Sequence, residues 1–579
     1  MLTKLAIHNF KLFDKVEIEL ADRVIFVGPN NSGKTSALQA LALWNVGVRR
    51  WVEKRGSANV PKARAGVTIN RRDLIALPLP AANLLWRNLR VREGHKEGGK
   101  PKTRNVLIEI DVEGVDQGTP WQTALEFDYA NEESFYCRSR MNDRGTRLPV
   151  PAAAAGVRLA YLPPMSGLAA NETRLDDGAI AVRIGEGRTA EVLRNLCWKV
   201  LEKDQTAWKK IIERMQRLFG ITLEDPDYVR ERGEITMSFR TARNVRLDLS
   251  ASGRGQQQTL LLLAHMAANP GAVLLLDEPD AHLEILRQRQ IYQVLTDAAI
   301  ESGSQIIAAS HSEVILNEAA DRDTVVAFVG QPHCINNRGS QVRKALREIG
   351  FEHYMQAEET GWVLYLEGPT DLAILRAFAD KLDHPARRHL ERPFVHYVAN
   401  QPRKAQDHFY GLREANPNLI GVALYDHLDQ LPPTNDLNLD LVHLAWRRRE
   451  IENYLCQDAT LLSWAEAQGR EQGELFAVAW SEKMRCAISE IRKKLGARGK
   501  PPPDSPDVKA SEDFLDPLFK RFYQALGMPN LMSKTCYHTL ASFVPTDMLD
   551  AEVREKLDAI AEVASRAQPK CPAPCPPET

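Results

Sequence analysis

One stretch of the chain has the residue types and spacing of a loop that binds phosphate. Residues 28–36 fit the pattern G-x-x-x-x-G-K-[ST], and the positions they offer to a nucleotide are Gly28, Asn30, Asn31, Ser32, Gly33, Lys34, Thr35 and Ser36. Glycines allow the backbone to curl until its N–H groups point at one phosphate. Lys34 is expected to reach the β- and γ-phosphates of ATP, and the Thr35 hydroxyl to bind Mg²⁺.

The segments on either side of this loop are those that such a loop needs. The apolar run 24–27 predicts a buried strand, and residues 36–41 open a helix whose N-terminus adds partial positive charge. The alternative is an ordinary glycine-rich turn before a helix. The combination of strand, loop, lysine and helix argues against that alternative.

Two further apolar runs end in residues that suit ATP hydrolysis. Residues 273–276 predict a central strand followed by Asp277 and Glu278. Asp277 is expected to hold Mg²⁺ in its outer coordination shell, and Glu278 to polarise the attacking water. Another predicted strand, 305–310, leads to His311, which is well placed to touch a γ-phosphate. Asp277 and Glu278 alone could mark a strand-end turn, but the order of all these motifs favours an ATPase site.

The order of motifs in residues 1–330 resembles that of ABC-type ATPases of the SMC and OLD (overcoming lysogenization defect) group. The resemblance includes a segment rich in serine and glycine, 249–258, before a predicted helix over 259–268. In that group such a segment caps the ATP held by a second subunit. The resemblance therefore implies nucleotide contacts from Ser252 and Gly255 and at least a dimer. The segment is looser than Leu-Ser-Gly-Gly-Gln.

A second set of carboxylates follows two predicted strands in the C-terminal half. Glu367 comes after the strand 363–366, and Asp426 and Asp429 come after the strand 419–425. Ligands collect at the carboxyl ends of parallel strands, so these side chains are expected to converge. Clustered hard oxygen ligands suit Mg²⁺ or Mn²⁺. The alternative for Glu367 and the glycine after it is an ordinary turn.

Residues 361–560 resemble the Toprim (topoisomerase–primase) domain of OLD-family nucleases. The matching segments are Glu367-Gly368, an Asp-x-Asp motif that begins at Asp426, residues 449–455 and residues 533–535. The resemblance implies further metal ligation by Glu450 or Glu452. It also implies that Lys534 neutralises charge on the phosphate under attack. The second aspartate of the Asp-x-Asp motif is replaced by Leu428, and Asp429 lies one residue later.

Length and these motifs predict a chain of several domains. The expected fold class is α/β, with an ABC-type P-loop ATPase head followed by a Toprim, Rossmann-like domain. The predicted boundaries are an ATPase domain over 1–335, a linker over 336–360, the Toprim-like domain over 361–560 and a disordered tail over 561–579. Helical periodicity over 188–220 predicts a helical hairpin inserted in the head, which could pack on its own domain or form a dimer contact.

Composition limits the partners of the chain. The formal net charge of −1 gives no overall attraction to nucleic acid or anionic lipid, so DNA contacts must come from local clusters. The candidates are Arg447-Arg448-Arg449 and a second cluster within 492–500, which could equally be solvated helix faces. No apolar run approaches the roughly 20 residues of a membrane helix. Scattered cysteines and an N-terminus without a signal-peptide core predict a cytoplasmic protein.

Together with these motifs, the resemblance to OLD-family proteins implies an ATP-regulated DNA endonuclease that depends on Mg²⁺ or Mn²⁺. The resemblance to OLD proteins implies antiphage defence, a homo-oligomer held together through the ATPase domain, and a companion defence protein. One alternative is an ATPase switch whose Toprim-like half only binds a partner or nucleic acid, which Leu428 favours. Another is an SMC-like DNA-repair ATPase, although the predicted insertion is far shorter than the coiled coils of those proteins.

Overall fold

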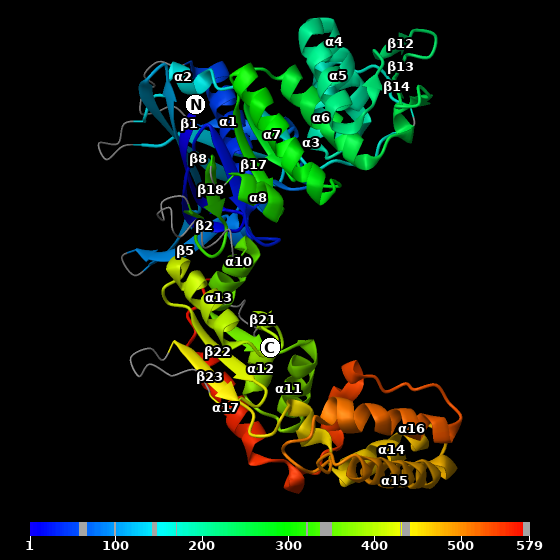
Figure 1. Cartoon of the computed structure of the whole chain (residues 1–579). Helices are drawn as coiled ribbons and strands as arrows, with labels where there is room; N and C mark the ends of the chain where they lie inside the picture. The colour runs from blue at the N-terminus through cyan, green and yellow to red at the C-terminus, as the bar shows by residue number, and fades with distance from the viewer. Residues whose placement is uncertain are drawn as a thin grey trace. The chain divides into compact units, whose positions relative to one another are not determined.

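The computed structural model describes residues 1–56, 66–97, 100–141, 147–169, 171–319, 322–335, 350–428, 430 and 440–570 (Figure 1). The chain divides into two compact units, residues 1–339 and 340–579. Each unit has a hydrophobic core of its own. The division falls inside the interval that the sequence predicts to be a linker.

The first unit contains two six-stranded sheets with one long helix between them. The antiparallel sheet has the order β2 (Phe13–Glu19), β1 (Leu2–Phe10), β7 (Ile108–Asp116), β8 (Thr119–Asn131), β9 (Ser134–Ser139) and β4 (Val67–Asn70). The other sheet has the order β10 (Leu159–Leu162), β16 (Val273–Asp277), β17 (Gln305–Ser310), β3 (Arg23–Val27), β18 (Thr324–Ala327) and β19 (His333–Cys334). Its strands are parallel except for β19. The helix α1 (Lys34–Arg55) contacts both sheets, and its tryptophans Trp44 and Trp51 are buried.

The remaining elements of this unit are short or belong to a helical region (Figure 1). The short ones are η1 (Arg71–Asp73), η2 (Ala82–Leu85), η3 (Arg87–Leu89), β5 (Arg92–Glu97), β6 (Lys100–Asn105), α2 (Ala152–Ala155), η4 (Thr189–Val192), β11 (Thr222–Leu223), β12 (Asp227–Val229), β13 (Glu234–Thr236), β14 (Ser238–Arg240), β15 (Arg246–Asp248) and η5 (Leu249–Ala251). The longer helices are α3 (Asp177–Gly185), α4 (Leu193–Lys203), α5 (Gln205–Phe219), α6 (Arg254–Ala268), α7 (Ile285–Ser302) and α8 (Glu313–Ala319).

The predicted helical hairpin over 188–220 is confirmed as the pair α4 and α5. The pair is joined at Asp204, whose side chain accepts hydrogen bonds from the N–H groups of Thr206 and Ala207 and so caps α5. Both helices contact α6 of the same unit. Trp208 and Ile211 lie on the buried face of α5. The hairpin therefore packs on its own domain, and whether it also forms a dimer contact stays a prediction.

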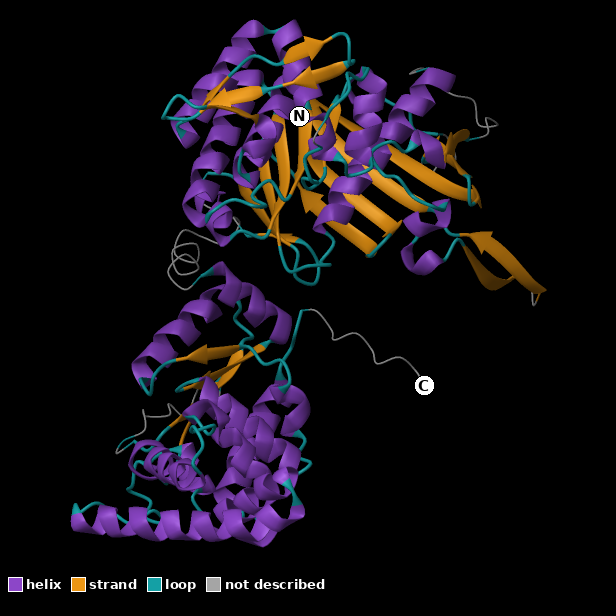
Figure 2. Cartoon of the chain, turned by 90° about the vertical axis from the view of Figure 1, so that its right-hand side faces the viewer, coloured by secondary structure: helices purple, strands orange, loops and turns teal. Residues whose placement is uncertain are grey.

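The second unit is built on a four-stranded parallel sheet. The strand order is β21 (Val395–Tyr397), β20 (Trp362–Leu366), β22 (Ile420–Tyr425) and β23 (Leu441–Ala445). The helices that contact this sheet are α10 (Phe351–Thr360), α11 (Pro369–Lys381), α13 (Pro402–Ala415) and α17 (Ala551–Arg566), and α12 (Ala386–Leu390) packs on α11 and α17. Figure 2 shows helices on both sides of the strands of this unit. The central strands β20 and β22 are apolar and buried, as expected of a sheet covered on both faces.

A helical region follows β23 and was not predicted from the sequence. It contains η6 (Ile451–Leu455), α14 (Asp458–Gln472), α15 (Glu474–Ala497), the π-helix η7 (Ala510–Leu515), α16 (Asp516–Leu526), η8 (Lys534–Phe543) and η9 (Thr546–Met548). Its core includes Trp464, Phe519 and Phe522, whose rings meet edge to face. The chain then returns to the sheet through α17, which contacts β22.

Two predicted boundaries are corrected by the structure. Residues 351–360 of the predicted linker form α10, which packs on β20 and α13 because its Tyr354 and Ala357 are buried apolar positions. The predicted disordered tail, 561–579, begins within α17, whose residues Ile560 and Val563 are buried. Residues 571–579 lie outside the described part of the chain.

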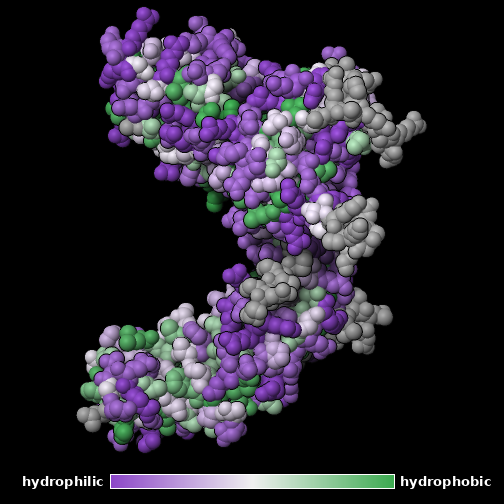
Figure 3. All heavy atoms as spheres, turned by 180° about the vertical axis from the view of Figure 1, so that it is seen from behind, coloured by the Kyte–Doolittle hydropathy of each residue, from purple (hydrophilic) through white to green (hydrophobic). Residues whose placement is uncertain are grey.

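The surface in Figure 3 is mainly hydrophilic, with hydrophobic residues in small scattered groups. Scattered apolar side chains are usual on a protein surface and need no partner. Within the described part of the chain, every helix is too short or too polar to cross a bilayer.

Candidate functional site

The strand order of the parallel sheet brings the predicted ATPase motifs to one edge. β3, which leads into the phosphate loop, pairs with β17, and β17 pairs with β16. All three run in the same direction, so their carboxyl ends lie together. Gly33 ends the loop at a φ of 103°, and a Cβ there would meet the ring of Phe13 at 2.7 Å. Glycine is therefore required at this position for both conformation and space.

Lys34 is held inside the loop. Its Nζ donates hydrogen bonds to the carbonyl oxygens of Gly28 at 2.7 Å and Pro29 at 2.9 Å, and it lies 3.4 Å from Nδ1 of His311. The side chain is buried, and burial lowers the pKa of the ammonium to about 8. A phosphate in the loop would supply the negative charge that these carbonyls lack.

Thr35 and Asp277 are in direct contact, as a shared magnesium site requires. Thr35 Oγ1 donates to Asp277 Oδ1 at 3.2 Å, and the Tyr161 hydroxyl donates to Asp277 Oδ2 at 3.3 Å. Burial raises the pKa of the Asp277 carboxyl to about 6, despite these two donors. A divalent cation beside Thr35 and Asp277 would favour the ionised carboxylate.

Glu278 and His311 face each other across an open hollow of about 400 Å³, which Asn30, Asp280 and Ala281 also line. His311 Nε2 lies 3.6 Å from Glu278 Oε1. Glu278 has a φ of 50°, which is unusual for a residue other than glycine. Such strained backbone conformations are often found at functional sites. Burial lowers the pKa of His311, and the nearby Lys34 lowers it further.

The other loop residues differ in exposure. Asn30 is exposed, while Ser36 is buried in the first turn of α1. Asn31 has a left-handed φ of 62°. Ser32 Oγ is buried and has no hydrogen-bond partner among the described residues. An unpartnered hydroxyl inside a phosphate loop is available to a ligand.

Among the described residues, no hydrogen bond joins the serine- and glycine-rich segment, 249–258, to the phosphate loop. Ser252 is buried, and its Oγ donates to the carbonyl of Leu249 at 2.6 Å. Gly255 lies in the first turn of α6, where a Cβ would approach Leu283 at 3.2 Å. The Ser252 hydroxyl is therefore engaged in its own turn.

The second unit gathers its carboxylates at the ends of its two central strands. Glu367 follows β20 and Asp426 follows β22, and these strands are neighbours in the sheet. Burial raises the pKa of Asp426 far above its ordinary value, and the neighbouring Glu367 carboxyl raises it further. The charges of Asp371 and Glu450 add to the shift.

Asp371 supports the turn that carries Glu367. Its Oδ2 accepts hydrogen bonds from the backbone N–H groups of Glu367 at 3.0 Å and Gly368 at 3.2 Å. Burial raises the pKa of Asp371 to about 6, and the nearby Glu367 charge contributes. Asp371 thus fixes the first turn of α11 and adds a carboxyl to the group.

Glu450, Glu452 and Lys534 complete this acidic site. Glu450 is 3% exposed and Glu452 is 2% exposed. Glu450 Oε1 accepts a hydrogen bond from the N–H of Ser511. Lys534 Nζ lies 3.7 Å from Glu452 Oε1, which has no hydrogen-bond partner among the described residues. Burial raises the pKa of Glu452 to about 7, and the charge of Glu450 adds to this.

The acidic site offers oxygen ligands to a hard divalent cation, although no three of its described carboxylates have ligand oxygens within 4.8 Å of one another. The pKa values of Asp371, Asp426 and Glu452 are raised, and a buried oxygen of Glu452 has no partner in the described chain. The residues that could hold the cation are Glu367, Asp426, Glu450 and Glu452. Asp429 lies outside the described residues, and Leu428 is half-buried.

The basic clusters proposed from the sequence as DNA contacts are largely paired with acids. Arg447 and Arg448 lie beside Glu555 and Asp550 respectively. In the second cluster the pairs are Arg492 with Asp458, Lys494 with Glu490, and Lys500 with Asp513. These pairs reduce the free positive charge of both clusters. For Arg492 and Lys494, which lie on α15, this is expected of a solvated helix face.

Two residues that shape the sites were not singled out from the sequence. Tyr161 lies in the short strand β10, and only the pairing of β10 with β16 shows that its hydroxyl reaches Asp277. Asp371 could have been found, because an acid three positions after the glycine at a helix start is typical of a capping box.

Two protein-family models match the first unit. "AAA ATPase domain" matches residues 1–53, and "AAA domain, putative AbiEii toxin, Type IV TA system" matches residues 200–317. The two segments contain the phosphate loop and the Asp277–His311 region. The chain contains a P-loop ATPase domain. The first unit is called the ATPase unit below.

Curated relatives match a smaller part of the chain. They are annotated by the name "Putative peptide import ATP-binding protein" in Brucella abortus and Brucella suis, with 33% identity over 78 residues. The match spans 14% of this chain and 23% of each relative.

Solved structures similar to this chain include two SMC heads. The SMC head domain from Thermotoga maritima is 18% identical, with a TM-score of 0.30, and the match covers 58% of this chain and 98% of that domain. The Smc head with an extended coiled coil from Pyrococcus furiosus, bound to a domain of ScpA, is 13% identical, with a TM-score of 0.34. That match covers 60% of this chain and 99% of the other.

Proposed function

We propose that the chain is an ATP-regulated, divalent-metal-dependent DNA endonuclease of the OLD type. The observation that carries this proposal is the acidic site of the second unit. Glu367 and Asp426 follow neighbouring strands at their carboxyl ends, where Glu367 raises the pKa of Asp426, and Lys534 Nζ lies 3.7 Å from Glu452 Oε1. β20 and β22 lie where the strand order reverses, and ligands bind there in open parallel sheets.

The roles of the side chains follow from their charge. Glu367, Asp426, Glu450 and Glu452 hold the cation, and Asp371 orients Glu367 through the backbone of its turn. Lys534 supplies positive charge to a phosphate that approaches Glu452. A bound Mg²⁺ or Mn²⁺ would stabilise charge on the oxygens of the phosphodiester that enter and leave.

In the ATPase unit, Lys34 binds the β- and γ-phosphates and Thr35 and Asp277 hold Mg²⁺. Glu278 orients the water that attacks the γ-phosphate, and His311 lies beside it. Ser252 and Gly255 act on the nucleotide of a second copy, so the ATPase unit works as a dimer. The exposed start of α6 in the single chain supports this arrangement.

A role in defence is supported by one family description. The model that matches residues 200–317 is named for a toxin of a type IV TA system. The resemblance to OLD proteins supports the same setting, with phage DNA as the substrate and a companion defence protein as a partner in the cytoplasm.

A second candidate function is an ATPase switch whose second unit binds nucleic acid or a partner without cleaving it. Leu428, which stands where the Asp-x-Asp motif has its second aspartate, favours this alternative. The arginines and lysines of the basic clusters are also paired with acids, which leaves little positive charge there to hold DNA for cleavage.

Incubation of supercoiled plasmid with the full chain and Mg²⁺ or Mn²⁺, with and without ATP, tests the proposal. Nicked or linear DNA that depends on the cation supports the endonuclease. Intact plasmid under all four conditions, together with a gel shift, supports the switch.

A further inference from the structure

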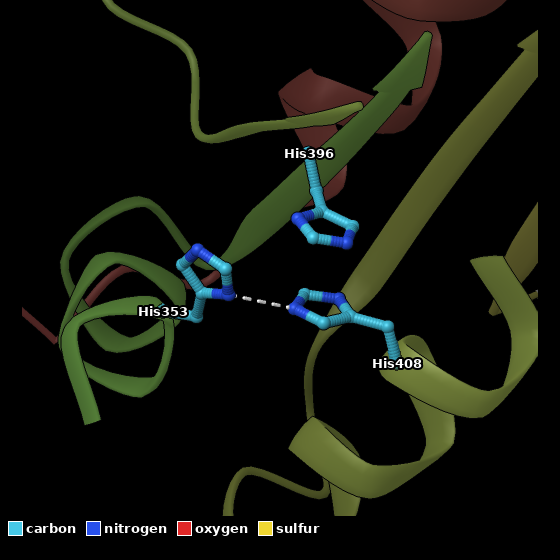
Figure 4. Close-up of side chains that lie close together, drawn as sticks. All are labelled: His353, His396 and His408. Atoms are coloured by element: carbon cyan, nitrogen blue, oxygen red, sulfur yellow. Dashed lines mark hydrogen bonds between the residues drawn. The ribbon is translucent and has the colours of Figure 1, made fainter. Parts of the chain in front are cut away.

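Three histidines from separate elements meet beside the sheet of the second unit. His353 lies on α10, His396 on β21 and His408 on α13, and their rings face one another in Figure 4. One ring nitrogen of each can be chosen so that all three nitrogens lie within 4.8 Å of one another. Among the described residues, no other group of His, Cys, Asp and Glu side chains meets this spacing.

Hydrogen bonds and stacking fix the rings. His353 Nδ1 and His408 Nε2 are 2.9 Å apart and share a hydrogen bond. The other nitrogen of His408, Nδ1, bonds the Tyr365 hydroxyl at 2.9 Å. The His396 ring stacks on that of His408 with 3.8 Å between centroids and 5° between planes. Each nitrogen of His408 therefore has a defined direction, one toward Tyr365 and one toward the other histidines.

The surroundings favour neutral rings at His396 and His408 and offer no carboxylate. Burial lowers the pKa of His396 to about 4 and that of His408 to about 3, and the neighbouring histidines contribute. Phe394 packs against His353 with 5.7 Å between centroids. None of the three histidines hydrogen-bonds an acidic side chain within the described chain. A neutral imidazole carries a free lone pair, which is the form that ligates metals.

We propose that His353, His396 and His408 form a binding site for a divalent transition-metal ion such as Zn²⁺. Three imidazole nitrogens with an open fourth position are a known donor set for zinc. Imidazole also selects Zn²⁺, Co²⁺ or Ni²⁺ over Mg²⁺ and Mn²⁺, which prefer oxygen. This site is therefore chemically distinct from the acidic site at Glu367 and Asp426.

Tyr365 is a positioning residue in this proposal. When its oxygen accepts the N–H at Nδ1 of His408, the lone pair of Nε2 points toward His353 and the metal. His396 must turn out of its stack on His408, and His353 must move its proton to Nε2. The terminal torsion of histidine is broad, so rotation of the His396 ring about it is permitted. Each neutral ring keeps one N–H, so no proton is lost.

The site would connect three separate pieces of the second unit. α10 is the first described helix of that unit, and the metal would hold it to β21 and α13. The ion is thus expected to stabilise this edge of the sheet and to act independently of DNA cleavage.

Titration of the full chain with Co²⁺ tests the site. The protein is freed of any histidine tag, stripped with a chelator and kept in excess Mg²⁺, which occupies oxygen sites. The visible d–d absorption of Co²⁺ reports nitrogen ligation, and competition with Zn²⁺ gives its affinity. The variants are His353→Gln, His396→Gln and Tyr365→Phe, with His389→Gln as a control on a histidine outside the trio.

One Co²⁺ per chain is expected for the wild type and for His389→Gln. His353→Gln and His396→Gln should bind at least tenfold more weakly, and Tyr365→Phe roughly 10–100-fold more weakly. Circular dichroism in the absence of metal checks that each variant is folded, and Tyr365→Phe preserves the trio if the histidine variants do not fold. The proposal would be overturned if the wild type did not bind Co²⁺. It would also be overturned if Tyr365→Phe and either histidine variant bound Co²⁺ with the affinity of the wild type.

Discussion

Asp426 and Glu367, which follow the two central strands of the parallel sheet, lie beside each other although they are far apart in the sequence, and Glu367 raises the pKa of the Asp426 carboxyl. Two neighbouring carboxyl groups disfavour each other's ionisation unless a positive charge lies between them. Asp371 and Glu450 add negative charge to the same place. The clustered carboxyl groups of the acidic site therefore favour the binding of a cation.

Glu367→Ala should abolish DNA nicking and leave ATP hydrolysis near its normal rate. The substitution removes one ligand and relieves repulsion without touching the ATPase unit. Plasmid nicking and phosphate release are measured on the same preparation. Glu391→Ala, an exposed acid on the same unit, is the matched control. Nicking by Glu367→Ala at the wild-type rate would contradict the nuclease assignment.

Lys34→Ala should abolish ATP hydrolysis and weaken nucleotide binding. Lys34 is the buried cation of the loop, and no other side chain of residues 28–36 carries a positive charge. Binding of a fluorescent ATP analogue and steady-state hydrolysis measure the two effects. Lys54→Ala, at the exposed end of the same helix, should change neither.

Glu278→Gln should bind ATP and fail to turn it over. The amide keeps the size of the side chain but cannot polarise water, and loss of such a group typically costs about 10²–10⁴-fold in rate. Single-turnover hydrolysis and retention of radiolabelled ATP report the two properties, with Glu284→Gln as control. A Glu278→Gln protein that hydrolyses ATP normally would rule out Glu278 as the group that activates water.

ATP should drive self-association of the chain. The proposed roles of Ser252 and Gly255 require a second copy, and Glu278→Gln should prolong the associated state by trapping ATP. Light scattering at micromolar concentration measures the mass with and without ATP. Lys34→Ala should show no ATP-dependent change. A Glu278→Gln protein that stays monomeric with ATP bound would count against the dimer.

His265 should make the ATPase unit less stable in mild acid. Burial lowers its pKa in the folded state to about 4, below the ordinary value of 6.5. The unfolded chain therefore takes up the proton first, and the free energy of unfolding falls as the pH decreases from about 6.5 to about 4. The loss is about 3 kcal/mol at most.

Denaturant unfolding of the ATPase unit across this pH range measures the effect. His265→Gln should flatten the pH dependence between pH 6.5 and 4, whatever it does to stability at neutral pH. His8→Gln, on a partly exposed strand position, should retain the wild-type slope. An unchanged slope in His265→Gln would show that other groups cause the acid sensitivity.

The local elements of the ATPase unit were predictable because each carries its own signal. The apolar run 24–27 before the phosphate loop predicted strand β3, which the structure confirms. The apolar runs ending at Asp277 and Ser310 were confirmed as β16 and β17. Such runs depend on burial of the strand itself, which a sequence records directly.

Long-range packing was not predictable from the same patterns. Residues 351–360 are polar in composition, and only their contacts with β20 and α13 make them a helix of the core rather than a linker. The helices α14, α15 and α16 have apolar faces, but the sequence does not say which element covers them. The hydroxyl of Tyr161 reaches Asp277 through strand pairing, which has no local signal.

The segment after α17 meets the beginning of the second unit. The N–H of Lys570 donates to the carbonyl of Glu358 at 3.0 Å, and its ammonium pairs with the Glu358 carboxylate. The backbone at Gln568 and Pro569 passes so close to Gly361 that a Cβ there would lie 2.8 Å away. The first and last described segments of the second unit therefore lie next to each other. A domain with adjacent ends can be inserted into another protein or circularly permuted without a change in its core.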